Sequence, residues 1–175
     1  VTGSTTTIVG AGTTSVTVTQ AADTNYNTAT ATMTLTVSLA DIANASITAI
    51  SDQTYTGSAI TILPTVTFNN STVTETTDYT LSFTNNTNAG NASLTITGTG
   101  NFTGTQTVSF TIVKADPTIT FSDVTKTYGE PDFNLSATSS STGPFTFTIA
   151  DTNIATVTGS ITTIVGAGNT TVTVS

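Results

Sequence analysis

The sequence predicts an all-β protein, and three observations lead to this class. Fifty of the 175 residues are Thr, a β-branched residue that favours the pleated strand over the helix. No stretch places apolar residues at helical spacing over the roughly 10 positions that a helix needs. Short segments instead alternate apolar and polar residues, as expected for sheets with one buried and one solvated face.

One strand-like stretch recurs at a fixed interval. AGTTSVTVT at 11–19 returns as AGNASLTIT at 89–97 and as AGNTTVTVS at 167–175, so both intervals are 78 residues (89 − 11 and 167 − 89). The first and last copies belong to longer matching segments, 1–19 and 157–175, which differ at four of nineteen positions. The middle copy is more divergent, which indicates two alternating module types, A and B.

Two further matches follow the same order along the chain. TNYNTATATMTLTV at 24–37 resembles GNFTGTQTVSFTIV at 100–113, and SDQTYTG at 51–57 resembles SDVTKTYG at 122–129. With one gap, three apolar positions of the first segment fall on three of the second: Met33, Leu35 and Val37 on Val108, Phe110 and Ile112. Three matches in one order predict a repeat.

The period sets the size of the module. Seventy-eight residues exceed the roughly 20–50 residues of a solenoid repeat but accommodate a small sandwich with a strand every 8–12 residues or so. We therefore expect residues 1–37 to form the C-terminal portion of a type A module and residues 38–114 a complete type B module. Residues 115–175 then form a type A module that lacks its last strand.

The type B module shows its strands most clearly. We expect seven strands, over 46–50, 58–62, 64–68, 71–74, 79–83, 92–97 and 106–113. Leu94 and Ile96 should face the core from the sixth strand, and Val108, Phe110 and Ile112 from the seventh. Seven short strands with polar turns match an immunoglobulin-like sandwich, with a small barrel as the alternative.

The glycine that opens each copy of the recurring strand is a backbone marker. We expect Gly12, Gly90 and Gly168 to adopt positive φ or to allow a close backbone approach. The junctions between modules are short, and Pro117 follows the second one. Short junctions restrict the angles between neighbours more than a Gly/Ser tether does.

Charge and cysteine content exclude several classes. The net charge is −8, with only Lys114 and Lys126 as basic residues, so neither nucleic acid nor an anionic membrane surface is expected as a partner. No apolar run approaches the ~20 residues of a membrane span. The absence of Cys excludes disulfides, zinc thiolates and thiol nucleophiles.

The acidic residues offer one candidate metal site. Asp123, Glu130 and Asp132 form the closest grouping, but the spacing of calcium ligands is absent. Paired carboxylates can cleave glycosidic bonds, yet the chain has no Trp and few aromatic residues to line a sugar cleft. With no His and two Lys, an activated Ser or Thr nucleophile is not expected. We therefore assign no catalytic, cofactor-binding or metal residues and no cofactor.

Several other side chains have both a structural and a functional interpretation. Lys126 or Lys114 could form an isopeptide bond with an Asn. Tyr55 and Tyr128 are read as residues at the core edge rather than ligand platforms. The sequons at Asn44, Asn91 and Asn101 are expected by chance in a chain so rich in Asn, Ser and Thr.

Three longer stretches carry a family resemblance. DQTYTGSAI at 52–60, DYTLSFTNNTNAGNASLTITGTGNFTGT at 78–105 and KTYGEPDFNLSATSS at 126–140, the last followed by IATVTGS and TTIVGAG, resemble the immunoglobulin-like tandem repeats of giant bacterial surface adhesins. The likeness covers essentially the whole chain and is greatest to Bacteroidetes-type proteins, including gliding-motility adhesins. It implies extracellular display at the cell surface, export by a dedicated secretion system, and a filament whose repeats act as spacers. It carries over no binding residue.

The resemblance and the composition together lead to a structural hypothesis. We expect stalk repeats of a long adhesin filament, with neighbouring repeats of the same chain as partners and no catalysis. The alternative is a module of the same adhesin that binds cell-surface or environmental polysaccharide directly, through exposed Thr rows or loops. An enzyme is a more distant alternative.

The module boundaries make one prediction about burial. Residues 1–37 should lack the strands that face them, so residues 33, 35 and 37 should be less buried than residues 108, 110 and 112. On this reading the chain is a window from a longer polypeptide. A corollary is head-to-tail association in which residues 24–37 enter another molecule's open sandwich, which requires one copy of the recurring strand to be displaced.

Overall fold

The computed structural model describes residues 5–175 and is an all-β structure consistent with a β-sandwich. The chain folds as two compact units, Val1–Ala115 and Asp116–Ser175. Within the described part, the single helical element is the 3-10 turn η1 (Ile42–Asn44). The Asp41 side chain caps this turn by accepting a hydrogen bond from the N–H of Ala43.

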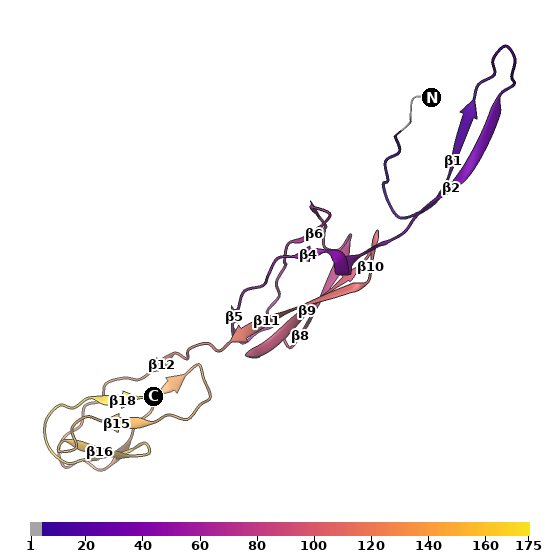
Figure 1. Cartoon of the computed structure of the whole chain (residues 1–175). Helices are drawn as coiled ribbons and strands as arrows, with labels where there is room; N and C mark the ends of the chain where they lie inside the picture. Colours follow the sequence, from indigo (N-terminus) through magenta and orange to yellow (C-terminus); the bar gives the residue numbers. More distant parts are fainter. Residues whose placement is uncertain (1–4) are drawn as a thin grey trace. The chain divides into compact units, whose positions relative to one another are not determined.

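The first unit begins with a long hairpin (Figure 1). Strand β1 (Gly12–Gln20) pairs antiparallel with β2 (Ala29–Val37), from Gly12 opposite Val37 to Gln20 opposite Ala29. In the turn, Asp23 accepts hydrogen bonds from the backbone N–H groups of the second and third residues after it. All of β1 is exposed, and β2 is half-buried only at Leu35 and Val37.

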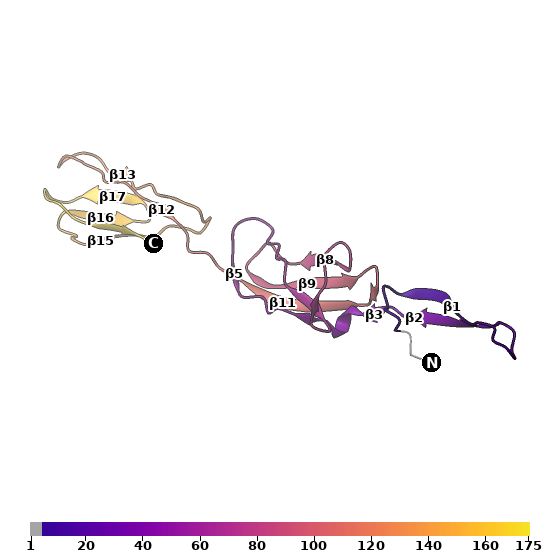
Figure 2. The ribbon, with the colours of Figure 1, turned by 90° about the horizontal axis from the view of Figure 1, so that it is seen from above.

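The rest of the first unit holds three small sheets. One has the order β5-β11-β9-β8, one the order β4-β6-β7, and β10 pairs with β3. In Figure 2 β8, β9 and β11 lie side by side. The strands are β3 (Ala40–Asp41), β4 (Ser46–Ile47), β5 (Gln53–Thr54), β6 (Val66–Phe68), β7 (Ser71–Thr72), β8 (Tyr79–Thr84), β9 (Gly90–Gly98), β10 (Phe102–Thr103) and β11 (Thr105–Val113).

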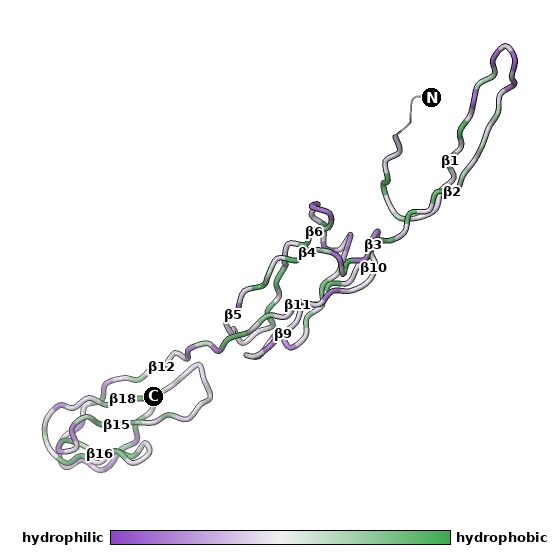
Figure 3. The backbone as a smooth tube through the Cα atoms, in the orientation of Figure 1, coloured by the Kyte–Doolittle hydropathy of each residue, from purple (hydrophilic) through white to green (hydrophobic). Residues whose placement is uncertain are grey.

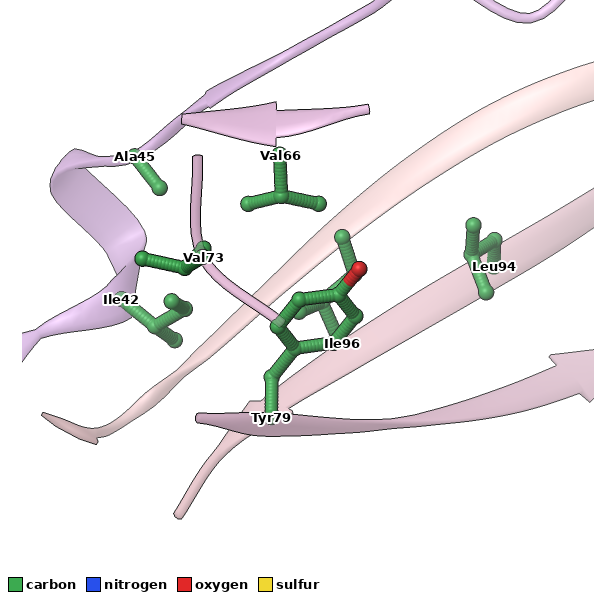
Figure 4. Close-up of a cluster of buried hydrophobic side chains, with 7 residues drawn as sticks. All are labelled: Ile42, Ala45, Val66, Val73, Tyr79, Leu94 and Ile96. Atoms are coloured by element: carbon green, nitrogen blue, oxygen red, sulfur yellow. The ribbon is translucent and has the colours of Figure 1, made fainter. Parts of the chain in front are cut away.

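The core of this part lies between β9 and the segments that face it. Figure 4 shows the main cluster, in which Leu94 and Ile96 of β9 are fully buried beside Tyr79, and Ile42 and Val66 complete the set with Ala45 and Val73. A second cluster gathers Ala92 of β9 with Phe110 and Ile112 of β11. The predicted inward rows of β9 and β11 are therefore confirmed.

Several strand boundaries differ from the prediction. Residues 58–62 do not form a strand, because their backbone pairs with a loop: the N–H of Ile60 donates to the carbonyl of Asn86, and the Asn86 side chain donates back to the Ile60 carbonyl, both at 2.8 Å. The strands within 46–50, 64–68 and 71–74 are shorter than expected. Three two-residue strands, β3, β5 and β10, lack the length that would reveal an alternation in sequence.

A tight turn explains how β6 reaches β7. Asn69 and Asn70 form the hydrophilic turn in Figure 3, with φ of 48° and 64°. Asn tolerates this left-handed region better than most residues, and two such residues in succession match the twist of a two-residue hairpin.

The second unit is also built from short antiparallel pairs. Its sheets have the orders β12-β14, β13-β17-β16 and β15-β18. The strands are β12 (Ile119–Thr120), β13 (Phe133–Asn134), β14 (Thr138–Ser139), β15 (Phe147–Ile149), β16 (Ala155–Thr158), β17 (Ile161–Ile164) and β18 (Val172–Val174). Leu135 is the one buried apolar residue described in this unit, whereas the first unit has ten, so the second core is much less closed.

The expected burial difference is present. Met33 is 57% exposed and Leu35 and Val37 are half-buried, while Phe110 and Ile112 are 5% and 1% exposed and Val108 is half-buried. The three glycines also behave as predicted, because Gly12, Gly90 and Gly168 have φ of 145°, 136° and 155°. These are values that residues with a Cβ rarely adopt.

Candidate functional site

The acidic residues of the second unit do not form a metal site. Among residues 5–175 no three acidic side chains lie together in a group able to hold a metal ion. Glu130, the central member of the trio Asp123, Glu130 and Asp132, is instead engaged locally. Its carboxylate accepts a hydrogen bond from the Thr127 N–H at 3.1 Å and lies 3.2 Å from the Lys126 ammonium. These interactions, the backbone hydrogen bond first, hold the pKa of Glu130 below its ordinary value.

Lys126 is occupied by the same local arrangement. Its ammonium lies 5.1 Å from the centroid of the Phe133 ring as well as beside Glu130. The partner that the structure gives this ammonium is thus a Glu in ion-pair geometry, and not the Asn of the isopeptide hypothesis. A side chain held by an ion pair and a cation–π contact has a structural role in positioning the 126–130 turn.

The two tyrosines differ in their surroundings. Tyr55 is 40% exposed, and its backbone N–H donates to the Val113 carbonyl at the end of β11, which fits the expected place at the edge of the core. Tyr128 is 67% exposed, so the expectation of a core-edge residue is wrong there. It follows Thr127 in an exposed turn that places its ring at the rim of a cavity rather than against the core.

Asn101 has a contact that its sequon did not suggest. Its side-chain oxygen accepts a hydrogen bond from the N–H of Ala11 at 2.8 Å, and its carbonyl accepts one from the N–H of Ala40 at 3.0 Å. Asn101 therefore ties the segment before β1 and the start of β3 to the turn before β10. In the sequence, Asn101 stood out only as a sequon and as part of the match between residues 24–37 and 100–113.

A hydroxyl-rich face is the most regular surface of the first unit. On β9 and β11, Ser93 pairs with Ser109, Thr95 with Thr107 and Thr97 with Thr105. β8 extends the face with Thr80, Ser82 and Thr84. The Thr95 and Thr107 hydroxyls lie 3.1 Å apart and form a hydrogen bond with each other.

The hairpin carries a similar face. Its outward pairs are Thr13–Thr36, Ser15–Thr34, Thr17–Thr32 and Thr19–Thr30. The Thr17 and Thr32 hydroxyls lie 3.0 Å apart. The expected Thr rows thus exist as cross-strand ladders, an arrangement that stabilises a sheet without any ligand.

The clearest cavity lies in the second unit and has a volume of about 240 Å³. Its lining includes Phe133 of β13, Ile164 of β17 and Val172 of β18, together with Gly168 from the segment before β18. Val124 completes the rim and is 54% exposed. The cavity was not predicted from the sequence.

One polar atom in this cavity stands out. The Thr162 side chain on β17 is 2% exposed, and its hydroxyl has no hydrogen-bond partner among the residues that the structure describes. A buried hydroxyl without a partner destabilises a fold. Thr at an inward position of a strand gave no sequence signal, because Thr occupies inward and outward positions alike in this chain.

The pairing registers allow the strand pairs of the two units to be compared. In the first unit β9 has two neighbours: Leu94 lies opposite Phe83 of β8 and opposite Val108 of β11. In the second unit Val172, 78 positions after Leu94, lies opposite Ile149 of β15. Among the described residues β18 has no partner on its other edge. The β15–β18 pair is thus antiparallel like β8–β9, with the difference that β8 and β9 are consecutive strands while β16 and β17 lie between β15 and β18.

The hairpin reproduces the other half of the same sheet. Val16 lies opposite Met33 as Leu94 lies opposite Val108, and Gly12 lies opposite Val37 as Gly90 lies opposite Ile112. β2 thus occupies beside β1 the position that β11 occupies beside β9. The sequence alignment of the two segments and the observed registers agree residue for residue.

Comparisons with known proteins add no family or fold neighbour: no family model, no curated protein and no solved structure matches the chain. Within residues 5–175, no helix has the length and apolar character to cross a membrane. The functional argument therefore relies on the chain's own geometry.

Proposed function

We propose that this chain is a set of spacer repeats in the stalk of a long extracellular bacterial adhesin, displayed at the cell surface and without catalysis. The observation that carries the proposal is a parallel pairing of two strands that are distant along residues 38–114. β5 pairs in parallel with the C-terminal end of β11, Gln53 opposite Ile112 and Thr54 opposite Val113. The Tyr55 N–H extends this pairing to the Val113 carbonyl at 2.9 Å.

A parallel pair of this kind suits a segment that bears tension. When the two ends of such a segment are pulled apart, parallel strands slide past one another and their hydrogen bonds carry the load together. Strands joined as a hairpin would instead peel apart one hydrogen bond at a time. β3 and β10 form a second parallel pair, Ala40 with Phe102 and Asp41 with Thr103, close to where the segment begins.

The chemistry of the surface supports the same role. The chain has two basic residues and no His or Cys, which leaves few groups for acid–base or nucleophilic catalysis. Its outward rows are hydroxyl ladders that partly satisfy one another. Neighbouring repeats of the same polypeptide are the partners that this proposal requires.

Single-molecule stretching of the chain tests the proposal. Unfolding of residues 38–114 should release about 250–280 Å of contour length before subtraction of the folded length, at a force peak that depends on the β5–β11 pair. Tyr55→Pro removes the donor to Val113 and should lower that peak. Thr56→Pro is the matched control, because the Thr56 side chain bonds only the nearby Ser58. An equal peak for wild type and Tyr55→Pro would contradict load bearing by this pair.

A second candidate function is direct binding of polysaccharide by the hydroxyl face of β8, β9 and β11. The observation that favours it is the regular spacing of neutral hydroxyls over three adjacent strands. Glycan arrays and adsorption to polysaccharide surfaces distinguish the two candidates. Saturable binding that Thr95→Glu abolishes and Thr13→Glu, on the hairpin, leaves unchanged would establish the binding module, whereas the spacer proposal predicts no saturable binding by this chain.

A further inference from the structure

We propose that the outer edge of strand β8 (Tyr79–Thr84) is an interaction edge, and that it pairs antiparallel with the same strand of a second copy of this chain. The sheet β5-β11-β9-β8 of one copy would then continue through β8 into the sheet of the other. β8 lies between β7 and β9 along the chain, with all of residues 38–114 described around it. The inference does not depend on the proposed stalk function, because it rests on the length, the backbone directions and the side chains of this edge.

β8 is the longest edge strand of the two larger sheets in residues 38–114 (Figure 2). The other edge strands, β4, β5 and β7, are two residues long, whereas β8 has six. The part of β11 that β5 leaves unpaired contacts η1. Exposed edges are usually protected by short strands, charged residues, proline or bulges. The β8 sequence YTLSFT has no charged residue and no proline, and its pairing with β9 is uninterrupted, so β8 has none of these protections.

The backbone directions show which groups the edge offers. The Asp78 carbonyl accepts a hydrogen bond from the N–H that follows β9, whereas the Tyr79 carbonyl accepts one from the Thr76 N–H, on the side away from β9, both at 2.8 Å. Backbone groups of successive strand residues point to opposite sides, so the N–H and carbonyl groups of Leu81 and Phe83 also point away from β9. Among residues 5–175, β9 is the only strand that pairs with β8. These four groups therefore remain for another strand.

A groove beside this edge offers space for the side chains of an added strand. It has a volume of about 330 Å³ and is lined by six residues: Thr61, Ile62, Leu63, Glu75, Leu81 and Phe83. Leu81 and Phe83 are half-buried and Leu63 is 65% exposed, so apolar walls are open to solvent. Residues that lie opposite Leu81 and Phe83 in an added strand share their face of the sheet. Apolar side chains at those positions would therefore contact the groove, as expected for strand addition.

A second copy of β8 has the side chains and backbone groups that this edge requires. With a two-fold axis at Ser82, Leu81 of each copy lies opposite Phe83 of the other, and each such pair exchanges two backbone hydrogen bonds. All four outward groups of both strands are then paired, and the apolar residues meet on the groove face. Thr80 lies opposite Thr84 on the other face and extends the hydroxyl face across the contact. A two-fold contact of this kind is closed and gives a dimer rather than an open filament.

The charges of the two copies permit this arrangement. Glu75 is the one charged residue that lines the groove, so a largely neutral strand such as β8 suits it. Glu75 and Asp78 precede β8, and in an antiparallel pair these ends lie about 20 Å apart, for six residues at ~3.3 Å each. The acidic residues of the two copies therefore do not meet, although the net charge is −8. The contact is small for a protein interface, so a single pair should associate weakly.

Hydrogen exchange of the full chain at two concentrations tests the edge. The N–H groups of Leu81 and Phe83 should exchange several-fold more slowly at about 1 mM than at about 10 μM, a range that spans the Kd of weak contacts. The N–H groups of Thr80 and Ser82, which point toward β9, should be protected at both concentrations. Ser82→Lys places two like charges opposite each other at the two-fold axis and should remove the concentration dependence.

The matched control is Ser109→Lys, at an exposed serine on the same face of β11, and it should retain the concentration dependence. Exchange that is independent of concentration in the wild type would overturn the proposal and leave the edge to a partner other than a second copy. An equal concentration dependence in Ser82→Lys and Ser109→Lys would place the contact elsewhere on the chain and overturn it as well.

Cysteine cross-linking of the full chain tests the register and detects a weak contact. The chain has no Cys, so a disulfide dimer reports only the introduced thiol. In the proposed pair Ser82 lies opposite Ser82 of the other copy, at the Cα separation of roughly 4.5 Å of a non-hydrogen-bonded pair, which a disulfide can span. In a thiol–disulfide redox buffer Ser82→Cys should give several-fold more dimer than Ser109→Cys, which is exposed on the same face. Equal yields from the two variants would refute the two-fold register at Ser82.

Discussion

Replacement of Phe110 by Ala tests which face of β11 is buried and how much the core contributes to the free energy of unfolding. Phe110 is 5% exposed and packs with Ala92 and Ile112, so its truncation should cost about 3–5 kcal/mol. A segment of about 80 residues has a total stability of about 4–12 kcal/mol at 0.05–0.15 kcal/mol per residue. The variant should therefore lose a quarter or more of the stability of residues 38–114, and in the least stable case should not fold.

The matched control is Thr111→Ala, one position along the same strand on the opposite face. Thr111 is half-buried, and its substitution should change the free energy of unfolding by less than about 1 kcal/mol. With a urea m-value of about 1–2 kcal/mol/M, Phe110→Ala should lower the midpoint by about 1.5–5 M. Hydrogen exchange read on peptides from β9 and β11 assigns the transition to this part of the chain. Similar midpoints for the two variants would show that the facing is reversed.

Three further predictions concern single positions. Gly90→Ala should destabilise the first unit by about 1–3 kcal/mol, because Gly90 has a φ of 136°, even though an added Cβ would meet no atom within 4 Å. The control is Gly143→Ala, where the nearest atom to the added Cβ would be 3.5 Å away; it should leave the thermal unfolding temperature nearly unchanged. Burial first, and then the charges of Glu75 and Asp78, raise the pKa of the Tyr79 phenol. The stabilising effect of the phenol is therefore complete below the unfolded-state pKa of about 10 and is lost as the pH rises through the folded-state pKa. The free energy of unfolding of Tyr79→Phe should fall less with rising alkaline pH than that of the wild type, and parallel pH curves would refute this. Thr162→Val removes a buried hydroxyl without a described partner and should stabilise the second unit by about 1–3 kcal/mol. The control Thr163→Val, on the exposed face, should not stabilise it. A loss of stability in Thr162→Val would mean that the hydroxyl has a hydrogen-bond partner.

The parts of the fold that were predictable are those with period-two alternation over many residues. β9 and β11 are nine residues each, and their inward rows could be read directly from Leu94, Ile96, Phe110 and Ile112. Two-residue strands such as β3 and β5 could not be predicted, because their pairing depends on partners more than 50 residues away. The failure at 58–62 has a different cause: the local pattern suits a strand, but the backbone of Ile60 pairs with the side chain and carbonyl of Asn86 in a loop.

The candidate site was predictable only in outline. The repeat predicted that residues 115–175 should lack a strand, and this stays a prediction, because β18 ends one residue before the last residue of the sequence. The residues that form the cavity come from four separate segments, so their convergence requires the fold. The spacing of the acidic residues, by contrast, was a weak guide to a metal site, because the Glu130 carboxylate pairs with the Lys126 ammonium and accepts a hydrogen bond from the Thr127 N–H.

The distribution of the repeats bears on how such a chain avoids misfolding. Strand exchange is easiest between near-identical elements that meet at high local concentration, and misassembly between similar neighbouring modules is a characteristic failure of repeat proteins. Here the near-identical strands β1 and β18 lie 156 positions apart, while the intervening copy, β9, differs from both and carries the bulkier Leu94 and Ile96 where they have Val. β11 likewise presents Phe110 where β2 presents Leu35. The predicted alternation of divergent copies would therefore give each module a core that its immediate neighbour's strand fits poorly. The compatible strand pairs would then be left to segments that are distant along the chain.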